Sequence, residues 1–442
     1  MDWKLMPAVW FIYMFSVLDR SNLGNAHQAG IDEGIGLVRN QYNILGTMFY
    51  LGYITSMWTV IGWKVFPAHI FAACIICAWA TMSSLQATVS NFGGLAAIRF
   101  FLGSFEAMYA GVPVYLSFFY PREKLGFRQG IFITGAAIAN AYGSALGYAI
   151  LHIRSYLAPW RILFLIEGLP SMMMAIIAFH VFPDSIRTAK FLTDREKEIG
   201  ASYVNHGQVA EMEHEKGISF ADWKEGLKDW RSFVTGVIFF GCNVSFASLP
   251  LFVPSIIAEI GIFSSLQSNG LSAPPYLFAF MVILAINFIA DRLRIRGPFV
   301  SVFGMIAAVG FMLLAITRNP IARYVGVYLA ILIYVSVSLM MSWVSNMHST
   351  ESKRSGGWTV FQMLGQCGPL LGTNVFPSSQ KPYFTKGSWI STGCCLLVAV
   401  VSAGLSYSLW RENKKLDRSL KEGKEGEAEA LSRGQKGFRY II

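Results

Sequence analysis

The sequence predicts an all-α polytopic membrane protein with twelve transmembrane helices, and three observations support this fold class. Hydrophobic residues make up 54% of the 442 residues and charged residues 14%, against roughly 25% charged in ordinary soluble domains. Apolar runs that can hold the roughly 20 residues needed to cross a bilayer recur along the whole chain. A polar stretch at 183–231 divides these runs into two equal sets.

The expected spans and their boundaries follow from the apolar runs. They lie at residues 5–28, 41–63, 67–89, 94–118, 128–150, 160–182, 232–257, 273–290, 298–317, 322–344, 355–375 and 388–410. We expect an N-terminal six-helix bundle over 1–182, a loop over 183–231, a C-terminal six-helix bundle over 232–410 and a polar tail over 411–442. An even number of spans leaves both termini on one side of the membrane.

The polar segments have patterns of their own. Within the loop, Phe220, Trp223, Leu227 and Trp230 recur every three or four residues, which predicts an amphipathic helix lying on the membrane surface. The tail alternates Lys and Arg with Glu and contains glycines, a composition typical of a solvated or disordered segment.

The distribution of Lys and Arg predicts the orientation. Most of the 36 basic residues fall on the side of the membrane that carries the N-terminus, and cytoplasmic segments carry such an excess. Both termini and the 183–231 loop are therefore expected to be cytoplasmic. The net charge of +10 reflects this topology and contact with anionic lipid; it gives no support to a nucleic-acid partner.

The first expected span carries an unusual set of polar residues. Asp19, Arg20, Asn22 and Asn25 follow the apolar run of residues 10–18. Ionisable groups at membrane depth usually face a bundle interior or a watery cavity. The alternative, a soluble helix N-terminus capped by Asp19 or Ser21, does not fit the apolar flanks.

Charges recur in the fourth and sixth spans. Arg99 and Glu106 share one helical face (i, i+7) but lie roughly 10 Å apart along the axis, so each needs another partner, which Asp19 or Arg20 can supply. Glu167 is a further acid within the sixth span. We expect Asp19, Arg99 and Glu106 to face one interior cavity, with Glu106 as the proton-coupling residue and Arg99 as the anion anchor. Asp19 is the competing proton carrier, and the alternative for the whole set is a structural salt-bridge cluster.

The second half offers neutral groups instead, among them Asn243, Tyr276 and Gln362. Prolines and glycines, as in residues 273–276 and 365–369, are expected to interrupt its helices, which is tolerated at membrane depth where a helix lines a cavity. Any proton relay is therefore expected in the first half.

Enzymatic chemistry is not expected. The six cysteines all fall in apolar runs, where packing explains them. No His-rich metal cluster or nucleophile–base arrangement stands out in the sequence, so neither a cofactor nor a catalytic site is predicted.

Several motifs together resemble one transporter family. The first-span stretch Leu18-Asp19-Arg20-Ser21-Asn22-Leu23-Gly24-Asn25-Ala26 is similar to the first-helix signature of the fungal allantoate permease-like anion:cation symporters, a branch of the major facilitator superfamily. The resemblance extends along nearly all of 10–410, including residues 91–95, 164–170, 183–185, 274–280, 291–293 and 297–299.

The resemblance implies two six-helix bundles that rock about a central site. It implies a monomeric plasma-membrane transporter that takes up a small organic anion, usually with protons. Family substrates include allantoate, nicotinate, pantothenate and biotin, and the resemblance does not choose among them.

The chain departs from the superfamily pattern at one gating loop. The loop between the second and third spans reads Gly62-Trp63-Lys64-Val65-Phe66 and lacks the usual Asp-Arg, whereas the corresponding loop of the second half keeps Asp291 and Arg292. The altered loop leaves a second hypothesis open, a non-transporting nutrient sensor or receptor on the same fold. The chain also starts closer to its first span than family members usually do, so a truncated start is expected.

Overall fold

The computed structural model describes residues 2–38, 40–120, 122–153, 155–207, 220–259, 265–345, 347, 351–422 and 440, and these contain helices but no β-strand. The helices of the first half are α1 (Leu5–Gln28), α2 (Ile31–Ile35), α3 (Gln41–Thr55), η1 (Met57–Ile61), α4 (Gly62–Val65), α5 (Ala68–Leu85), η2 (Gln86–Thr88), α6 (Phe92–Tyr109), α7 (Val112–Ser117), α8 (Arg122–Ile150) and α9 (Pro159–Val181). The connecting segment holds α10 (Asp194–Gly207) and α12 (Phe220–Lys228). The second half has α13 (Trp230–Ala258), α14 (Ser265–Leu293), α15 (Gly297–Ile316), α16 (Pro320–Ile331), α17 (Ile333–Ser345), α18 (Glu351–Gln366), α19 (Gly368–Gly372), η3 (Ser378–Gln380) and α20 (Thr385–Lys421).

Each expected span falls on helical structure, but the helices are not equally apolar. Within the described residues, eight helices or helix pairs are long and apolar enough to cross a membrane. The other four expected spans lie on α1, α3, α8 and α18. Helix α1 carries the polar residues of the opening motif, α3 has only 15 residues, and α8 and α18 begin with charged residues. The all-helical membrane fold is thus confirmed, and twelve spans stay a prediction.

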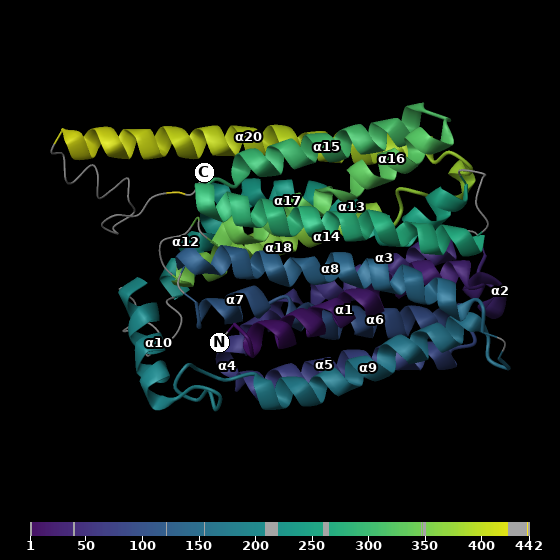
Figure 1. Ribbon diagram of the computed structural model, residues 1–442, viewed down its shortest axis with the longest axis horizontal. Coiled ribbons are helices and arrows are strands. Elements are labelled where there is room, and N and C mark those ends of the chain that lie inside the picture. Colours follow the sequence, from purple (N-terminus) through teal and green to yellow (C-terminus); the bar gives the residue numbers. More distant parts are fainter. Residues whose placement is uncertain are drawn as a thin grey trace.

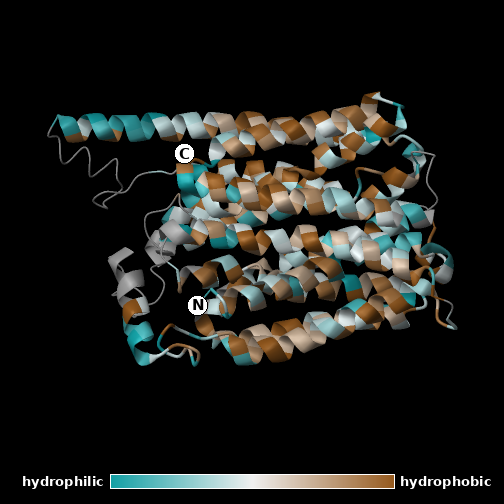
Figure 2. Ribbon diagram, viewed as in Figure 1, coloured by the Kyte–Doolittle hydropathy of each residue, from teal (hydrophilic) through white to brown (hydrophobic). Residues whose placement is uncertain are grey.

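The chain halves form two groups of helices that lie against each other. Figure 1 shows the first half, α1 to α9, in purple and blue below the second half, α13 to α20, in green and yellow. We call these groups the first and second bundles. The start of α1 and the end of α20 lie at one end of the molecule, here named the terminal end, and α2 lies at the opposite, far end. Hydrophobic residues dominate the middle of the helices (Figure 2).

Two elements differ from the sequence prediction. Helix α14 continues through Pro274 and Pro275, whereas the predicted break near 365–369 is present, since α18 ends at Gln366 and α19 begins at Gly368. Helix α20 runs through Lys421, 11 residues beyond the predicted end of its span at 410. Buried Leu409 and Leu416 continue the apolar stripe of α20 past that point, which explains the extension.

The connecting segment is attached to the second bundle. Helix α12 packs against α18, where a side chain added at Gly226 or Gly356 would collide with the backbone of the other helix. Lys353 pairs with Glu225 at 2.9 Å. Helix α12 thus covers Phe220 to Lys228 of the predicted amphipathic helix and packs on protein along one side, whereas Trp230 already begins α13. Its position on a membrane surface stays a prediction. Residues 208–219 of the loop and 423–439 of the tail lie outside the described residues.

Helices α3 and α6 approach backbone to backbone. A methyl group at Gly103 would overlap the carbonyl oxygen of Phe49, and one at Gly52 would overlap that of Phe100. Only glycine allows this approach, which fixes the register between the α3 aromatic residues and the charged face of α6.

This crossing gives a stability prediction. Gly103→Ala is expected to lower the free energy of unfolding by about 1–3 kcal/mol, because the added methyl forces the two backbones apart. Thermal unfolding of the purified protein in detergent measures the loss. Gly404→Ala on α20, where a methyl meets open space, is the control, and an equal change in both variants would contradict this account.

Candidate functional site

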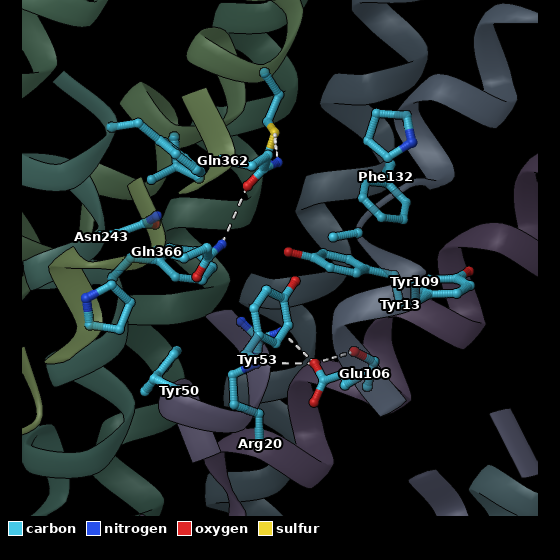
Figure 3. Close-up of a pocket in the computed structure, with 18 residues that line it drawn as sticks. Tyr13, Arg20, Tyr50, Tyr53, Glu106, Tyr109, Phe132, Asn243, Gln362 and Gln366 are labelled. Atoms are coloured by element: carbon cyan, nitrogen blue, oxygen red, sulfur yellow. Dashed lines mark hydrogen bonds and ion pairs between the residues drawn. The ribbon is translucent and has the colours of Figure 1, made fainter. Parts of the chain in front are cut away.

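A central cavity of about 590 Å³, open space at its mouth included, lies between the two bundles. Helices α1, α3, α6, α7 and α8 of the first bundle and α13, α17, α18 and α19 of the second contribute to its wall. Its lining consists of Tyr13, Ser16, Arg20, Tyr50, Tyr53, Glu106, Tyr109, Ala110, Pro113, Phe132, Phe239, Asn243, Phe246, Val337, Met341, Gln362, Gln366 and Pro369. Figure 3 shows the charged pair Arg20 and Glu106 on one side of the cavity and the amides Asn243, Gln362 and Gln366 on the other.

Arg20 and Glu106 form an ion pair in this wall. The Arg20 guanidinium donates to Glu106 Oε1 through Nη2 and, at 3.1 Å, through Nε. Ser16, one turn earlier on α1, donates to the same oxygen at 2.6 Å. The second oxygen, Oε2, has no hydrogen-bond partner among the described residues. Glu106 is therefore held from α1 and keeps one carboxylate oxygen unpaired.

Aromatic residues form the rest of the first-bundle wall. The Arg20 guanidinium lies over the rings of Phe49 and Tyr53 at 5.3 and 5.2 Å, close enough for cation–π attraction. Tyr13 and Tyr109 also line the cavity. Neither tyrosine was among the site residues predicted from the sequence. Their spacing was the available signal, since Tyr13, Ser16 and Arg20 follow i, i+3, i+7 and Tyr109 follows Glu106 by three.

The second-bundle wall is neutral, as predicted. Gln366 donates to Gln362 at 3.4 Å, and Gln362 in turn donates to the Met341 sulfur at 3.8 Å. Asn243 donates to the carbonyl oxygen of Gly365 at 3.1 Å. A thioether is a weak hydrogen-bond acceptor. The N–H group of the Gln362 amide is therefore available to donate to a ligand.

Arg99 lies apart from Glu106, contrary to the prediction that Asp19, Arg99 and Glu106 face one cavity. Its guanidinium donates to the backbone carbonyls of Asp19 and Arg20 at 3.5 and 3.3 Å and lies over the Phe49 ring. It lines a second cavity of about 370 Å³ on the far-end side of Arg20. Because nearly two α-helical turns separate positions 99 and 106, the two side chains reach different levels of α1.

Asp19 points away from both cavities, toward α5 and α9. Its carboxylate accepts hydrogen bonds from Ser83 at 2.6 Å and Ser171 at 2.9 Å and is fully buried. Glu167, one turn before Ser171, is also buried, and neither of its oxygens has a partner among the described residues. Consecutive helix positions differ by about 100°, so Asp19 and Arg20 face different neighbours.

Three further predicted site residues also lie outside the lining of both cavities. Asn22 is buried and its amide has no partner among the described residues. Asn25 lies near Gly143 of α8. Tyr276 packs edge-on against Tyr334, with ring centroids 5.9 Å apart.

The bundles meet closely at the far end. A side chain at Gly24 would put its first carbon 2.5 Å from the carbonyl oxygen of Pro250 on α13. Gln28 donates to Ser255 at 2.9 Å, and the Thr47 and Thr373 hydroxyls lie 3.0 Å apart. These contacts close the cavity at this end.

An ion pair of the second bundle, between Arg296 and Asp291, lies at the terminal end. Arg296 donates to Asp291 at 2.7 Å and to the carbonyl oxygen of Ser342 at 2.6 Å, and it packs against Gly126 of α8. The predicted gating residue Asp291 therefore uses Arg296, whereas Arg292 is exposed. In the altered loop of the first bundle, Trp63 is buried and donates to the carbonyl oxygen of Met108 at 2.7 Å.

The family follows from comparison with known proteins. The family model described as Major Facilitator Superfamily matches residues 9–373. The chain belongs to the Major Facilitator Superfamily. As a member of this transporter superfamily with helices long enough to span a bilayer, it is an integral, multi-pass membrane transporter.

Curated relatives and solved structures agree with this assignment. An uncharacterized transporter of Schizosaccharomyces pombe is 30% identical, over 95% of this chain and 83% of the relative. The high-affinity nicotinic acid transporter of Saccharomyces cerevisiae is 27% identical, over 94% of this chain and 78% of the relative. The solved proton:xylose symporter XylE shares the fold with a TM-score of 0.67 at 11% identity, over 93% of this chain and 96% of that one.

The far-end contact gives a prediction about accessibility. Gly24→Leu is expected to separate α1 from α13, because overpacking costs about 1–3 kcal/mol, which shifts a two-state population by about 5- to 150-fold. A cysteine introduced at Ser255 should then react faster with a membrane-impermeant maleimide. Gly393→Leu, at an open position of α20, is the control, and unchanged labelling in Gly24→Leu would contradict closure at this end.

Proposed function

We propose that this Major Facilitator Superfamily member is a proton-coupled symporter that takes up a small organic carboxylate. The observation that carries the proposal is the Arg20–Glu106 ion pair in the wall of the central cavity. Among the described residues, these two supply the charged side chains of that lining.

Arg20 is the anion anchor in this proposal. Arginine stays charged and binds a carboxylate through two parallel hydrogen bonds. Arg20 reaches the central cavity, whereas Arg99 uses its donors on the α1 backbone. The geometry therefore favours Arg20 over Arg99, with Arg99 holding the α1 segment that carries Arg20.

Glu106 is the coupling residue. Its carboxylate accepts hydrogen bonds from the Arg20 guanidinium, and a substrate carboxylate would bind to the same donors. Protonation of Glu106 removes the competing negative charge, leaving the cavity lining with the single positive charge of Arg20. Carboxylate binding and protonation are thereby coupled. Protonated Glu106 leaves Arg20 free to bind the substrate, and the bound substrate favours the protonated form of Glu106. Asp19 stays the competing proton carrier, held by two serines outside the cavity.

One relative supports a carboxylate substrate. The Saccharomyces cerevisiae relative is named for nicotinic acid, an aromatic carboxylate, and the aromatic wall of the central cavity suits a flat substrate. We place both termini on the cytoplasmic side and the protein in the plasma membrane as a monomer, which follows the Lys and Arg distribution and the family resemblance.

Transport is tested by uptake. Reconstituted protein, given an inward proton gradient, is assayed with radiolabelled nicotinate, pantothenate, biotin and allantoate. Saturable uptake of at least one compound that collapses with the gradient is expected. Saturable binding without flux for every compound would instead support the sensor hypothesis.

The coupling role gives a mutational prediction. Glu106→Gln is expected to lower gradient-driven accumulation by about tenfold or more, because the glutamine cannot carry the proton. Exchange of internal for external substrate should persist. Counterflow and net uptake are measured on the same vesicles. Glu33→Gln, which removes an exposed acid of α2, is the control. Wild-type accumulation in Glu106→Gln would rule out this assignment.

A further inference from the structure

The cytoplasmic extension of α20 carries a face that the transport mechanism does not use. Helix α20 has 37 residues and is therefore about 55 Å long, whereas the hydrocarbon core of a bilayer is about 30 Å thick. Its apolar stretch ends near Trp410, and the following turns are hydrophilic (Figure 2). In a bilayer, the boundary between these parts is expected where the acyl chains give way to the headgroups.

Two aromatic–cation pairs mark this boundary. The rings of Tyr407 and Trp410 stack with centroids 5.9 Å apart, and both are about half exposed. The Arg411 guanidinium lies 5.0 Å from the Tyr407 centroid, and the Lys414 ammonium lies 4.7 Å from that of Trp410. Side chains of a helix tilt toward its N-terminus, so both cations are directed back toward the bilayer.

These cations lack acidic partners. Arg411 and Lys414 are exposed, and no carboxylate within the described part of the chain pairs with them. The nearest acid along the helix, Glu412, bonds to Arg231 instead. The face formed by Tyr407, Trp410, Arg411 and Lys414, here named the α20 boundary face, is therefore positive and unneutralised.

A second source of positive charge lies on the turn between α14 and α15, which meets α20 one residue before Tyr407. The turn between α14 and α15 reaches α20 at Gly297, which packs directly on Ser406, the residue before Tyr407. The turn exposes Arg292 and Arg294, and neither has an acidic partner among the described residues. It also carries Arg296, whose side chain holds Asp291 and packs against α8.

We propose that the α20 boundary face, together with Arg292 and Arg294, binds the headgroup of an anionic phospholipid of the inner leaflet. The phosphate and carboxylate of such a lipid complement the four cations, and Tyr407 and Trp410 lie at headgroup level, where amphipathic rings are favoured. Because the same turn positions Arg296 against α8, lipid binding stabilises the contact between the bundles at the terminal end.

The test compares lipids retained by the purified full-length protein. Protein from nanodiscs containing equal amounts of phosphatidylserine and phosphatidylcholine is analysed by native mass spectrometry. The wild type is expected to retain phosphatidylserine in preference, and Arg411→Gln/Lys414→Gln is expected to lose about tenfold or more of that preference. Arg292→Gln/Arg294→Gln is expected to weaken it as well.

The control removes the same charge further along the helix. Arg418→Gln/Lys421→Gln lies roughly 12–17 Å beyond Trp410, too far to reach the phosphate, and should keep the wild-type preference. Equal retention of both lipids by the wild type would overturn the proposal. An equal loss in the control variant would also overturn it, because it would assign the preference to diffuse charge. Thermal unfolding of all variants shows that each is folded, and neither readout depends on transport.

Discussion

The ion pair between Arg20 and Glu106 is the interaction on which the central cavity depends. Both groups lie in a low-dielectric interior, where an unpaired charge is costly and a paired one is stable only if further hydrogen bonds satisfy it. The Arg20 guanidinium lies over the rings of Phe49 and Tyr53, and Glu106 accepts a hydrogen bond from the Ser16 hydroxyl. The partners of the pair thus lie within the protein itself, and a second anion competes directly for its cation.

The remaining polar groups of the first bundle hold this pair in place. Arg99 fastens α6 to the backbone of α1 at residues 19 and 20. Asp19 fastens the opposite side of α1 to α5 and α9 through two serines. The glycine contacts between α3 and α6 set the level of the aromatic rings. Each of these contacts positions Arg20 without touching the cavity centre.

The sequence predicted the fold class and the polar character of each half, because apolar run length and buried charges are local properties. It also predicted Arg20, Glu106, Asn243 and Gln362, all of which line the central cavity. It could not predict which of the adjacent residues Asp19 and Arg20 faces the cavity, since that depends on the rotation of α1 within the bundle. The tyrosines of the wall were missed because an aromatic residue in an apolar run is usually a packing residue. The partner of Asp291 was missed because it depends on the turn that follows α14, where Arg294 adopts a positive φ of 56°.

The central claim is that substrate and Glu106 compete for Arg20, and proton uptake on binding tests it most directly. Calorimetric titration of the first carboxylate found to bind, in buffers of different ionisation enthalpy, counts the protons taken up per bound molecule. The account predicts that the wild type takes up close to one proton per bound carboxylate and that Glu106→Gln takes up none. Tight carboxylate binding by the wild type with no proton uptake at any pH would contradict it.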